Sequence, residues 1–335
     1  MRGAIRASVA GVVLLLAVAG TPAGAAEPAP PTQQTQCVQV GRGDAIDGEP
    51  AAQQRLQFER VWPITEGAGI TVAVIDTGVT PHPAVADRLI GGPDLVVPEE
   101  NSLHDCDGHG TLVAGIIAAA DVNGGFAGVA PQATILSIRQ ASARYAYPDR
   151  QGEPVGDVST LAAAINAAIA AGVRVINISQ TGCVPTGTVN AGDDQLAGAI
   201  AAAEKADVVV VAAAGNTGAG GGSCTPNNTP GQPPVTVPLP ARFDTVLAVA
   251  AVGSSDTVAD FSLAGPWVDV AAPGTNIVSL DPGPGATGLV NKVAAGDTMN
   301  DINGTSFAAP YVSGVVALVR AAHPELTAAT GSSTP

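Results

Sequence analysis

The chain has 335 residues, of which 46% are hydrophobic, and a formal net charge of -15 at pH 7. A chain of this length can bury a large core, and a single α/β domain can reach this size. A nucleic-acid partner requires clustered Lys or Arg residues that bind phosphate, and because the sequence has no such cluster we exclude this class of partner.

The first 26 residues have the pattern of an export signal. Arg2 and Arg6 precede the apolar run VAGVVLLLAVAG, and small residues follow at positions 23 to 26. The run is shorter than the roughly 20 residues that a membrane span needs, so we predict a signal peptide over 1–26, with an uncleaved anchor as the alternative. Four cysteines, an even number, fit an exported protein in an oxidising compartment.

An arm over 27–60 follows, and its first residues, EPAPPTQQTQ, are rich in Pro and Gln and are expected to be extended and mobile. The main domain is predicted over 61–322, with a short tail over 323–335. In the domain, β-rich apolar runs alternate with Ala-rich helical stretches, which predicts a doubly wound, mainly parallel α/β sheet with helices on both faces. The expected strands cover 70–76, 133–139, 173–179, 207–215 and 245–253, and the expected helices cover 111–120, 157–172 and 193–206.

Three short stretches carry candidate catalytic groups. Asp76 ends the strand in ITVAVIDTGV, His109 opens a helix in DGHGT, and Ser306 opens a helix in NGTSFAAP. Taken singly, Asp76 is more often a turn residue, His109 a structural residue and Ser306 a helix cap. Because functional groups gather beyond the carboxyl ends of parallel strands, we expect them at one edge of the sheet.

Together these side chains fit nucleophilic catalysis. A serine hydroxyl needs an adjacent base to remove its proton, and His109 is the natural base. Asp76 could hold the imidazole in the right tautomer. Asn216 follows the strand in VVVVAAAGN, where its amide could donate a hydrogen bond to an oxyanion together with the backbone amide of Ser306.

The stretches IDTGV, DGHGT, AAAGN and NGTSFAAP resemble the four signatures of the subtilisin-like serine peptidases. The resemblance implies a subtilisin-like fold and hydrolysis of peptide bonds through an acyl-enzyme, with Asp76, His109 and Ser306 as the triad and Asn216 as an oxyanion donor. It also implies that the segment after the strand VRVINIS binds substrate. Here that segment consists of Ser179, Gln180, Thr181 and Gly182, where the family more often has a small, Gly-rich stretch.

The positions of the four cysteines suggest two disulfide bonds. Cys183 and Cys224 each follow a predicted strand, so both should emerge at the same edge of the sheet and could pair. This pairing leaves Cys37, in the arm, for Cys106, three residues before His109, and would staple the arm beside the candidate site. Two other connectivities remain possible.

The tethered arm, INISQTGCVP, DCDGHGT and GTSFAAPYVSGVVALVR together resemble the mycosins, the membrane-anchored subtilisin-like peptidases of type VII secretion in actinobacteria. The resemblance implies an exported endopeptidase, in the cell envelope or outside the cell, that cleaves a narrow set of secretion substrates and helps to stabilise the membrane complex. Its partners would be protein or peptide substrates and that complex. Mycosins continue into further structure and a C-terminal transmembrane helix, whereas this sequence shows no apolar run of spanning length near its end.

Other functions remain open at this point. The chain could be a structural component of the secretion complex with an idle or covered site, or a general secreted peptidase of the subtilisin type. The four intact groups at 76, 109, 216 and 306 favour activity. No metal-ligand spacing joins His82, His104 and His323, so we expect neither a metal nor a cofactor.

Overall fold

The computed structural model describes residues 29–43, 46, 48–98, 100–150, 152–218, 224–227 and 231–328. The predicted signal peptide over 1–26 lies outside these residues, as does most of the predicted tail. The domain boundaries at 60/61 and 322/323 stay predictions.

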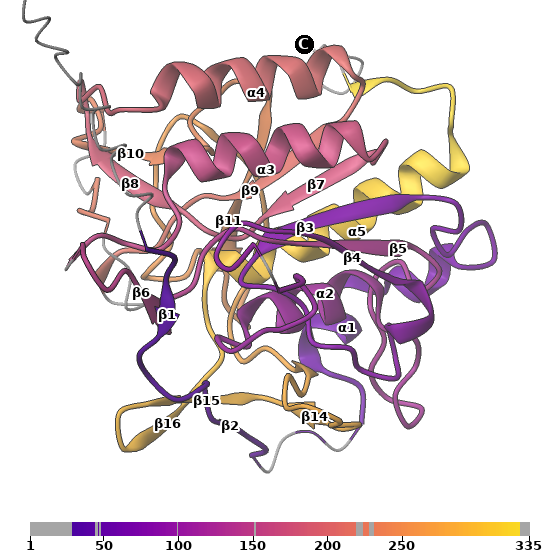
Figure 1. Ribbon diagram of the computed structural model, residues 1–335. Helices are drawn as coiled ribbons and strands as arrows, with labels where there is room; N and C mark the ends of the chain where they lie inside the picture. Colours follow the sequence, from indigo (N-terminus) through magenta and orange to yellow (C-terminus); the bar gives the residue numbers. More distant parts are fainter. Residues whose placement is uncertain are drawn as a thin grey trace, which may run out of the picture.

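Seven parallel strands form the central sheet in the order β12-β11-β9-β7-β3-β5-β4, which confirms the predicted fold class (Figure 1). Five of them fall on the predicted apolar runs. The other two, β4 and β12, were missed because their sequences, LIGGPD and VDVAAP, are partly exposed and lack a continuous apolar run. The strands are β3 (Thr71–Asp76), β4 (Leu89–Asp94), β5 (Thr134–Arg139), β7 (Val175–Ile178), β9 (Val209–Ala213), β11 (Val246–Val252) and β12 (Val268–Pro273).

The order of the strands places β3 where the direction of winding changes. β4 and β5 lie on one side of β3, and β7, β9, β11 and β12 lie on the other. In open α/β sheets, ligands bind beyond the carboxyl ends of the strands at such a point. Asp76, the last residue of β3, is therefore in the position where a site is expected.

Helices cover both faces of the sheet because successive strand side chains point in opposite directions (Figure 1). On β3, Val72 and Val74 pack into one core with α2 and α5, whereas Ala73 and Ile75 pack into the other with α3 and α4. The helices are α2 (His109–Ala118), α3 (Val158–Ala170), α4 (Asp193–Lys205) and α5 (Thr305–Ala322). α2 begins two residues before the stretch predicted over 111–120, and His109 is its first residue, as expected for a histidine that opens a helix.

α5 is long and apolar enough to cross a membrane by length and composition alone, in contrast to the sequence-based expectation for this end of the chain. However, 67% of its 18-residue window is buried inside the protein. Its side chains, including Phe307, Ala308 and Leu318, belong to the core beneath the sheet. In this structure, α5 is a core helix of the domain.

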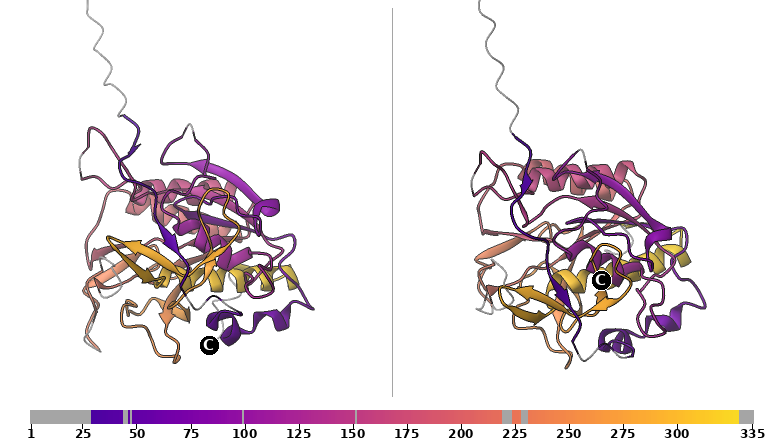
Figure 2. Two further views of the ribbon diagram at one scale, coloured as in Figure 1. Left: turned by 90° about the horizontal axis from the view of Figure 1, so that it is seen from below. Right: turned by 60° about the horizontal axis from the view of Figure 1, so that its bottom comes forward.

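The N-terminal arm is paired with the domain rather than free, so the expectation of a mobile start was wrong for the described residues from 29 onward. β1 (Thr32–Gln33) pairs with β6 (Tyr145–Ala146), and β2 (Val40–Gly41) pairs with β15 (Lys292–Ala295). Figure 2 shows this segment, in indigo, running along one side of the molecule. Backbone hydrogen bonds hold the arm although its side chains are mostly exposed.

Shorter elements complete the domain. They are α1 (Ala51–Leu56), η1 (Phe58–Val61), η2 (Ala86–Arg88), β8 (Gly182–Pro185), β10 (Thr236–Leu239), β13 (Ser279–Leu280), β14 (Leu289–Val290) and β16 (Thr298–Asp301). β8 pairs with β10, β13 with β14, and β15 with β16.

Candidate active site

The first two predicted groups meet at the end of β3. Asp76 is fully buried, and its Oδ1 lies 2.7 Å from His109 Nδ1 and accepts a 2.8 Å hydrogen bond from the backbone N–H of Thr77. A carboxylate only accepts hydrogen bonds, so Nδ1 of His109 is the protonated nitrogen. The other nitrogen, Nε2, is then free to act as a base.

His109 sits at the start of α2, with about a quarter of its side chain exposed (26%). Burial lowers the pKa of His109, but the charge of Asp76 and its hydrogen bond outweigh burial, so the pKa is raised above its usual value. Asp105 and Asp107 add to this effect. The imidazolium form of His109 is therefore stabilised by its surroundings.

Glycine at position 110 allows α2 to approach β3 closely. A Cβ on Gly110 would lie 2.0 Å from the carbonyl oxygen of Gly78 and 3.1 Å from Cβ of Asp76. No side chain fits at these distances. The segment that approaches Gly110 is the loop that follows Asp76.

A buried carboxylate that the sequence analysis missed, Asp105, holds the start of α2 against this loop. Its Oδ1 accepts hydrogen bonds of 2.8 Å from Thr77 Oγ1 and from the backbone N–H of Gly108. Its Oδ2 accepts hydrogen bonds from the backbone N–H and the hydroxyl of Thr111, at 2.8 and 2.7 Å. Asp105 therefore ties the residue after Asp76 to the turn that carries His109. The sequence places an Asp four residues before a helix-start His, but this spacing does not show where the carboxylate points.

Ser306 is the second residue of α5 and is 9% exposed. The ring of the next residue, Phe307, packs on the ring of His109 with centroids 5.0 Å apart, so the start of α5 lies against the imidazole. No hydrogen bond joins the Ser306 hydroxyl to His109, although the structure describes both residues. Such hydrogen bonds are often long or misaligned before substrate binds.

The amide of Asn216 is oriented by the neighbour of Ser306. Its Oδ1 accepts hydrogen bonds of 3.0 Å from both the backbone N–H and the hydroxyl of Thr305. This leaves Nδ2 as the end that can donate elsewhere. A Cβ on Gly304 would lie 2.9 Å from Ser306 Oγ and 3.4 Å from Asn216 Nδ2, so both groups flank the same point in front of Gly304.

The four residues expected to bind substrate follow β7, and they differ in their roles. Ser179 is buried and accepts a 2.9 Å hydrogen bond from Asn177 Nδ2, which makes it part of the core. Gly182 begins β8. Gln180 lines a cleft of about 540 Å³ that also contains His109. The other lining residues are Thr77, Asp107, Ala141, Ser142, Ala143, Tyr145, Glu153, Pro154 and Val155.

The cysteines form the two disulfides favoured by the sequence, Cys37–Cys106 and Cys183–Cys224. The Cys37–Cys106 disulfide joins the arm to Cys106, the residue that follows Asp105. Cys37, His104 and Cys106 are also the one group in the described part of the chain with the proximity of metal ligands. Because the two sulfurs are bonded to each other, neither is a thiolate that could bind a metal ion.

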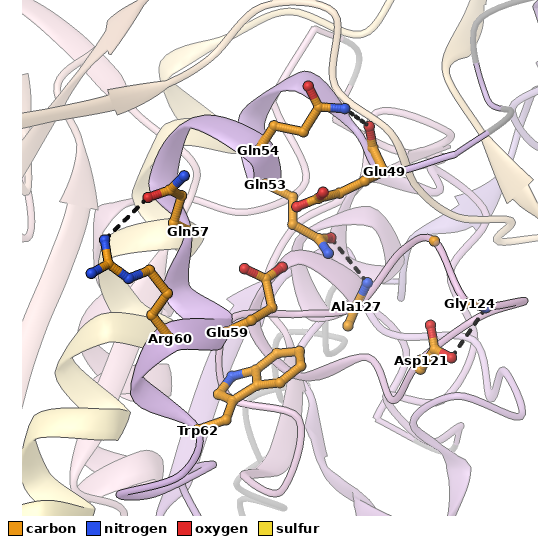
Figure 3. Close-up of a pocket in the computed structure, with 11 residues that line it drawn as sticks. Glu49, Gln53, Gln54, Gln57, Glu59, Arg60, Trp62, Asp121, Gly124 and Ala127 are labelled. Atoms are coloured by element: carbon orange, nitrogen blue, oxygen red, sulfur yellow. Dashed lines mark hydrogen bonds between the residues drawn. The ribbon is translucent and has the colours of Figure 1, made fainter.

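A second cavity, of about 620 Å³, lies between α1, η1 and the loop after α2 (Figure 3). Its polar groups largely bind the protein itself. Gln53 Oε1 accepts a 3.2 Å hydrogen bond from the backbone N–H of Ala127, and Asp121 Oδ2 accepts one of 3.1 Å from that of Gly124. None of the predicted site residues lines this cavity. The hydrogen bond between Gln53 and Ala127 links α1 to the neighbouring loop.

A buried Asp–His pair at the end of a central parallel strand, beside a serine that opens a core helix, is the arrangement of the subtilisin-like serine peptidases. Comparison with known proteins agrees. Residues 67–334 match the family model described as Subtilase family, Peptidase_S8.

Among curated proteins, the chain is 44% identical to Mycosin-4 of Mycobacterium tuberculosis, over 90% of this chain and 67% of the relative. It is 41% identical to Mycosin-3 of the same organism, over 93% and 72% of the two chains. Among solved structures, it resembles the MycP3 protease from the type VII (ESX-3) secretion system with a TM-score of 0.82 and 40% identity, over 90% and 85% of the chains. The chain therefore belongs to the subtilase family, within the mycosins, and is a serine endopeptidase.

A second structural relative belongs to an assembly. A chain in the structure of an intact ESX-5 inner membrane complex matches with a TM-score of 0.82 and 38% identity, over 90% of this chain and 76% of that one. Relatives of this protein are thus found both as separate proteases and within a secretion complex.

Proposed function

We propose that Asp76, His109 and Ser306 form the catalytic triad of this endopeptidase, with Asn216 and the backbone amide of Ser306 as oxyanion donors. The observation that carries the proposal is the 2.7 Å hydrogen bond between Asp76 and His109. The packing of Phe307 on the imidazole supports it, since this contact brings the start of α5 to His109.

In the proposed reaction, His109 Nε2 removes the proton of the Ser306 hydroxyl as its oxygen attacks the scissile carbonyl. Asp76 holds the Nδ1 proton and stabilises the imidazolium that forms. The oxyanion accepts hydrogen bonds from Asn216 Nδ2 and Ser306 N, at the positive end of the α5 dipole. His109 then protonates the leaving amine, and water hydrolyses the acyl-enzyme through the same groups.

The proposed substrates are proteins exported by the type VII system of the same cell, and the proposed location is the cell envelope, on the outer side of the membrane. Support comes from the matching chains in two structures, one of the intact ESX-5 inner membrane complex and one of the periplasmic assembly from that complex. The two disulfides fit such an oxidising location.

A second candidate function, a structural subunit with an idle or covered site, is favoured by the arm. The arm is bonded to Cys106, and Val38 donates a 2.8 Å backbone hydrogen bond to the Cys106 carbonyl, three residues from His109. An arm held so close could restrict access of general substrates. This function and the enzymatic one differ in whether Ser306 reacts.

The test is labelling of folded protein with a small fluorophosphonate, followed by mass spectrometry of the labelled peptide. We expect labelling at Ser306 that is lost in Ser306→Ala and His109→Ala. His323→Ala, which removes an exposed histidine at the end of α5, is the matched control and should label normally. Labelling that survives His109→Ala would remove the base from the mechanism, and a folded protein that never labels would favour the structural function.

The proposed substrates are tested in the cell. We expect new N-termini in exported proteins of a host that carries the wild-type gene, and their loss with Ser306→Ala. Equal sets of N-termini in the two strains, together with normal fluorophosphonate labelling, would contradict the substrate proposal while leaving the triad in place.

A further inference from the structure

The cleft that contains His109 is bounded on one side by residues 141–146, which we call the cleft loop. The loop follows β5, and near its start the backbone N–H of Ser142 donates a 3.2 Å hydrogen bond to the carbonyl oxygen of Val155. The loop residues that line the cleft are Ala141, Ser142, Ala143 and Tyr145. Because these residues form a wall, the position of the loop sets the width of the cleft.

Asp107, two residues before His109, binds the start of the cleft loop. Only 8% of its side chain is exposed. Its Oδ2 accepts a hydrogen bond from the hydroxyl of Ser142, and its Oδ1 accepts one of 2.9 Å from the backbone N–H of Ala143. Hydrogen bonds to an ionised acceptor are stronger than those between neutral groups. One carboxylate therefore holds two successive residues of the wall.

The next residue, Arg144, extends these contacts. Its backbone N–H donates a 3.1 Å hydrogen bond to Ser142 Oγ, the hydroxyl that is bound to Asp107. Its side-chain Nε lies 4.0 Å from Asp107 Oδ1, so a positive charge faces the carboxylate. The first part of the cleft loop is thus organised around the single negative charge of Asp107.

The N-terminal arm binds the second part of the same loop. The backbone N–H of Gln34 donates a 2.9 Å hydrogen bond to the carbonyl oxygen of Arg144, and β1 pairs with β6 at the end of the loop (Figure 1). The arm is itself joined by the Cys37–Cys106 disulfide to the residue directly before Asp107. The attachment of the arm and the carboxylate of Asp107 are therefore adjacent in the chain, and both hold the cleft loop.

We infer that Asp107 is a positioning residue that fixes the cleft loop, and with it the width of the cleft beside His109, before substrate binds. The inference rests on the proposed function, since it takes this cleft as the path of a peptide to His109 and Ser306. A wall that is already in place lowers the entropy cost of binding a peptide. Because Asp107 acts through Ser142 and Ala143, its loss should weaken peptide binding more than it slows the reaction of Ser306.

The test measures the labelling of Ser306 by a tetrapeptidyl diphenyl phosphonate at increasing concentrations, which separates the binding constant of the probe from its maximal labelling rate. Asp107→Ala removes both hydrogen bonds to the loop, so we expect it to weaken binding by about tenfold or more and to change the maximal rate less. In Asp107→Asn, Oδ1 can still accept from Ala143 and Nδ2 can donate to Ser142 Oγ, so this variant should bind the probe better than Asp107→Ala.

A second variant shows whether Asp107 acts through the cleft loop. Ser142→Ala removes the other side of the contact and keeps the test open if Asp107→Ala does not fold. Because the two residues share one hydrogen bond, the double variant Asp107→Ala/Ser142→Ala should weaken binding by less than the product of the two single effects. Asp244→Asn, at an exposed acid before β11 and thus at the opposite edge of the sheet, is the matched control and should bind the probe as the wild type does.

Several results would overturn the inference, and labelling of the wild type by a small fluorophosphonate separates them from failure of the proposed function. With that labelling intact, unchanged binding of the peptidyl probe to Asp107→Ala, equal weakening by the Asn and Ala variants, or single effects that multiply in the double variant would refute the role of Asp107. So would a wild type that the peptidyl probe labels without saturation. Failure of the fluorophosphonate as well would refute the proposed function and the inference with it.

Discussion

Asp105→Asn tests the electrostatics beneath the candidate site, because it removes a buried charge and nearly preserves the size of the side chain. Asp105 accepts four hydrogen bonds, from Thr77, Gly108 and Thr111. Burial nevertheless outweighs these bonds and raises the pKa of Asp105 to about 6, with a further contribution from the charge of Asp76. The charge of Asp76 therefore adds to the burial that disfavours ionisation of Asp105.

The sign and size of the effect follow from this shift. An Asp in an unfolded chain titrates near pH 3.9, so between about pH 4 and pH 6 the folded protein binds more protons than the unfolded chain. The contribution of Asp105 to the free energy of unfolding is therefore greatest below about pH 4 and declines as the pH rises to 6. A shift of about 2 pKa units corresponds to about 3 kcal/mol. Between pH 4 and pH 7 the wild type should lose about this much stability relative to Asp105→Asn.

The assay is urea unfolding with the disulfides intact, at several pH values from 4 to 7, for the wild type and Asp105→Asn. The quantity of interest is the difference between their free energies of unfolding at each pH, because groups that titrate alike in both proteins cancel. Because the charge of Asp105 raises the pKa of His109, the contribution of His109 does not cancel, so the difference is compared between pH 4 and pH 6, below the usual titration of histidine. Asp260→Asn, at an exposed acid, should show a constant difference. A constant difference for Asp105→Asn as well would refute the raised pKa.

Three further predictions concern catalysis. Gly304→Ala should lower kcat by about 10² or more, because the new Cβ would lie 2.9 Å from Ser306 Oγ and crowd the oxyanion position. Activity of this variant within threefold of wild type, measured with a peptide substrate, would contradict this geometry. Asn216→Ala should lower kcat by about 10² to 10³, because it removes an oxyanion donor. For Asn216→Ala, a loss below tenfold would mean that its Nδ2 does not face the oxyanion. Because the pKa of His109 is raised and the base must be neutral, kcat/KM should rise with pH around an apparent pKa above 6.5. Asp76→Asn should lower this apparent pKa and reduce kcat by about 10⁴. An apparent pKa that is the same in Asp76→Asn and in the wild type would count against the Asp76–His109 pair.

Much of the site could be predicted because its groups follow recognisable local patterns. Asp76 ends an apolar strand, and Ser306 lies at the start of an apolar helix. The alternation of strands and helices therefore predicted that both residues lie at the same edge of the sheet. The same argument favoured the pairing of Cys183 with Cys224 over the other connectivities, and the structure has this disulfide.

The supporting groups could not be predicted because they have no periodic pattern. Asp105 lies in a loop, and nothing in HDCDGHGT shows that its carboxylate turns inward to meet Thr77 from a strand end 28 residues away. The orientation of the Asn216 amide depends on Thr305, which is 89 residues distant in the chain. Such contacts exist only after the chain has folded, since each joins polar groups that water would otherwise solvate.

The sequence alone determined the class of fold, the residue types available for catalysis and their assignment to strand ends and helix starts, because hydrophobic periodicity and helix-start chemistry act over a few residues. Only the tertiary structure decided which atoms meet: the hydrogen bond of Asp76 to His109, the network around Asp105, and the hydrogen bond of Thr181 to Ala213. These contacts join residues on different strands and loops, so they depend on how the elements pack, which local sequence does not specify.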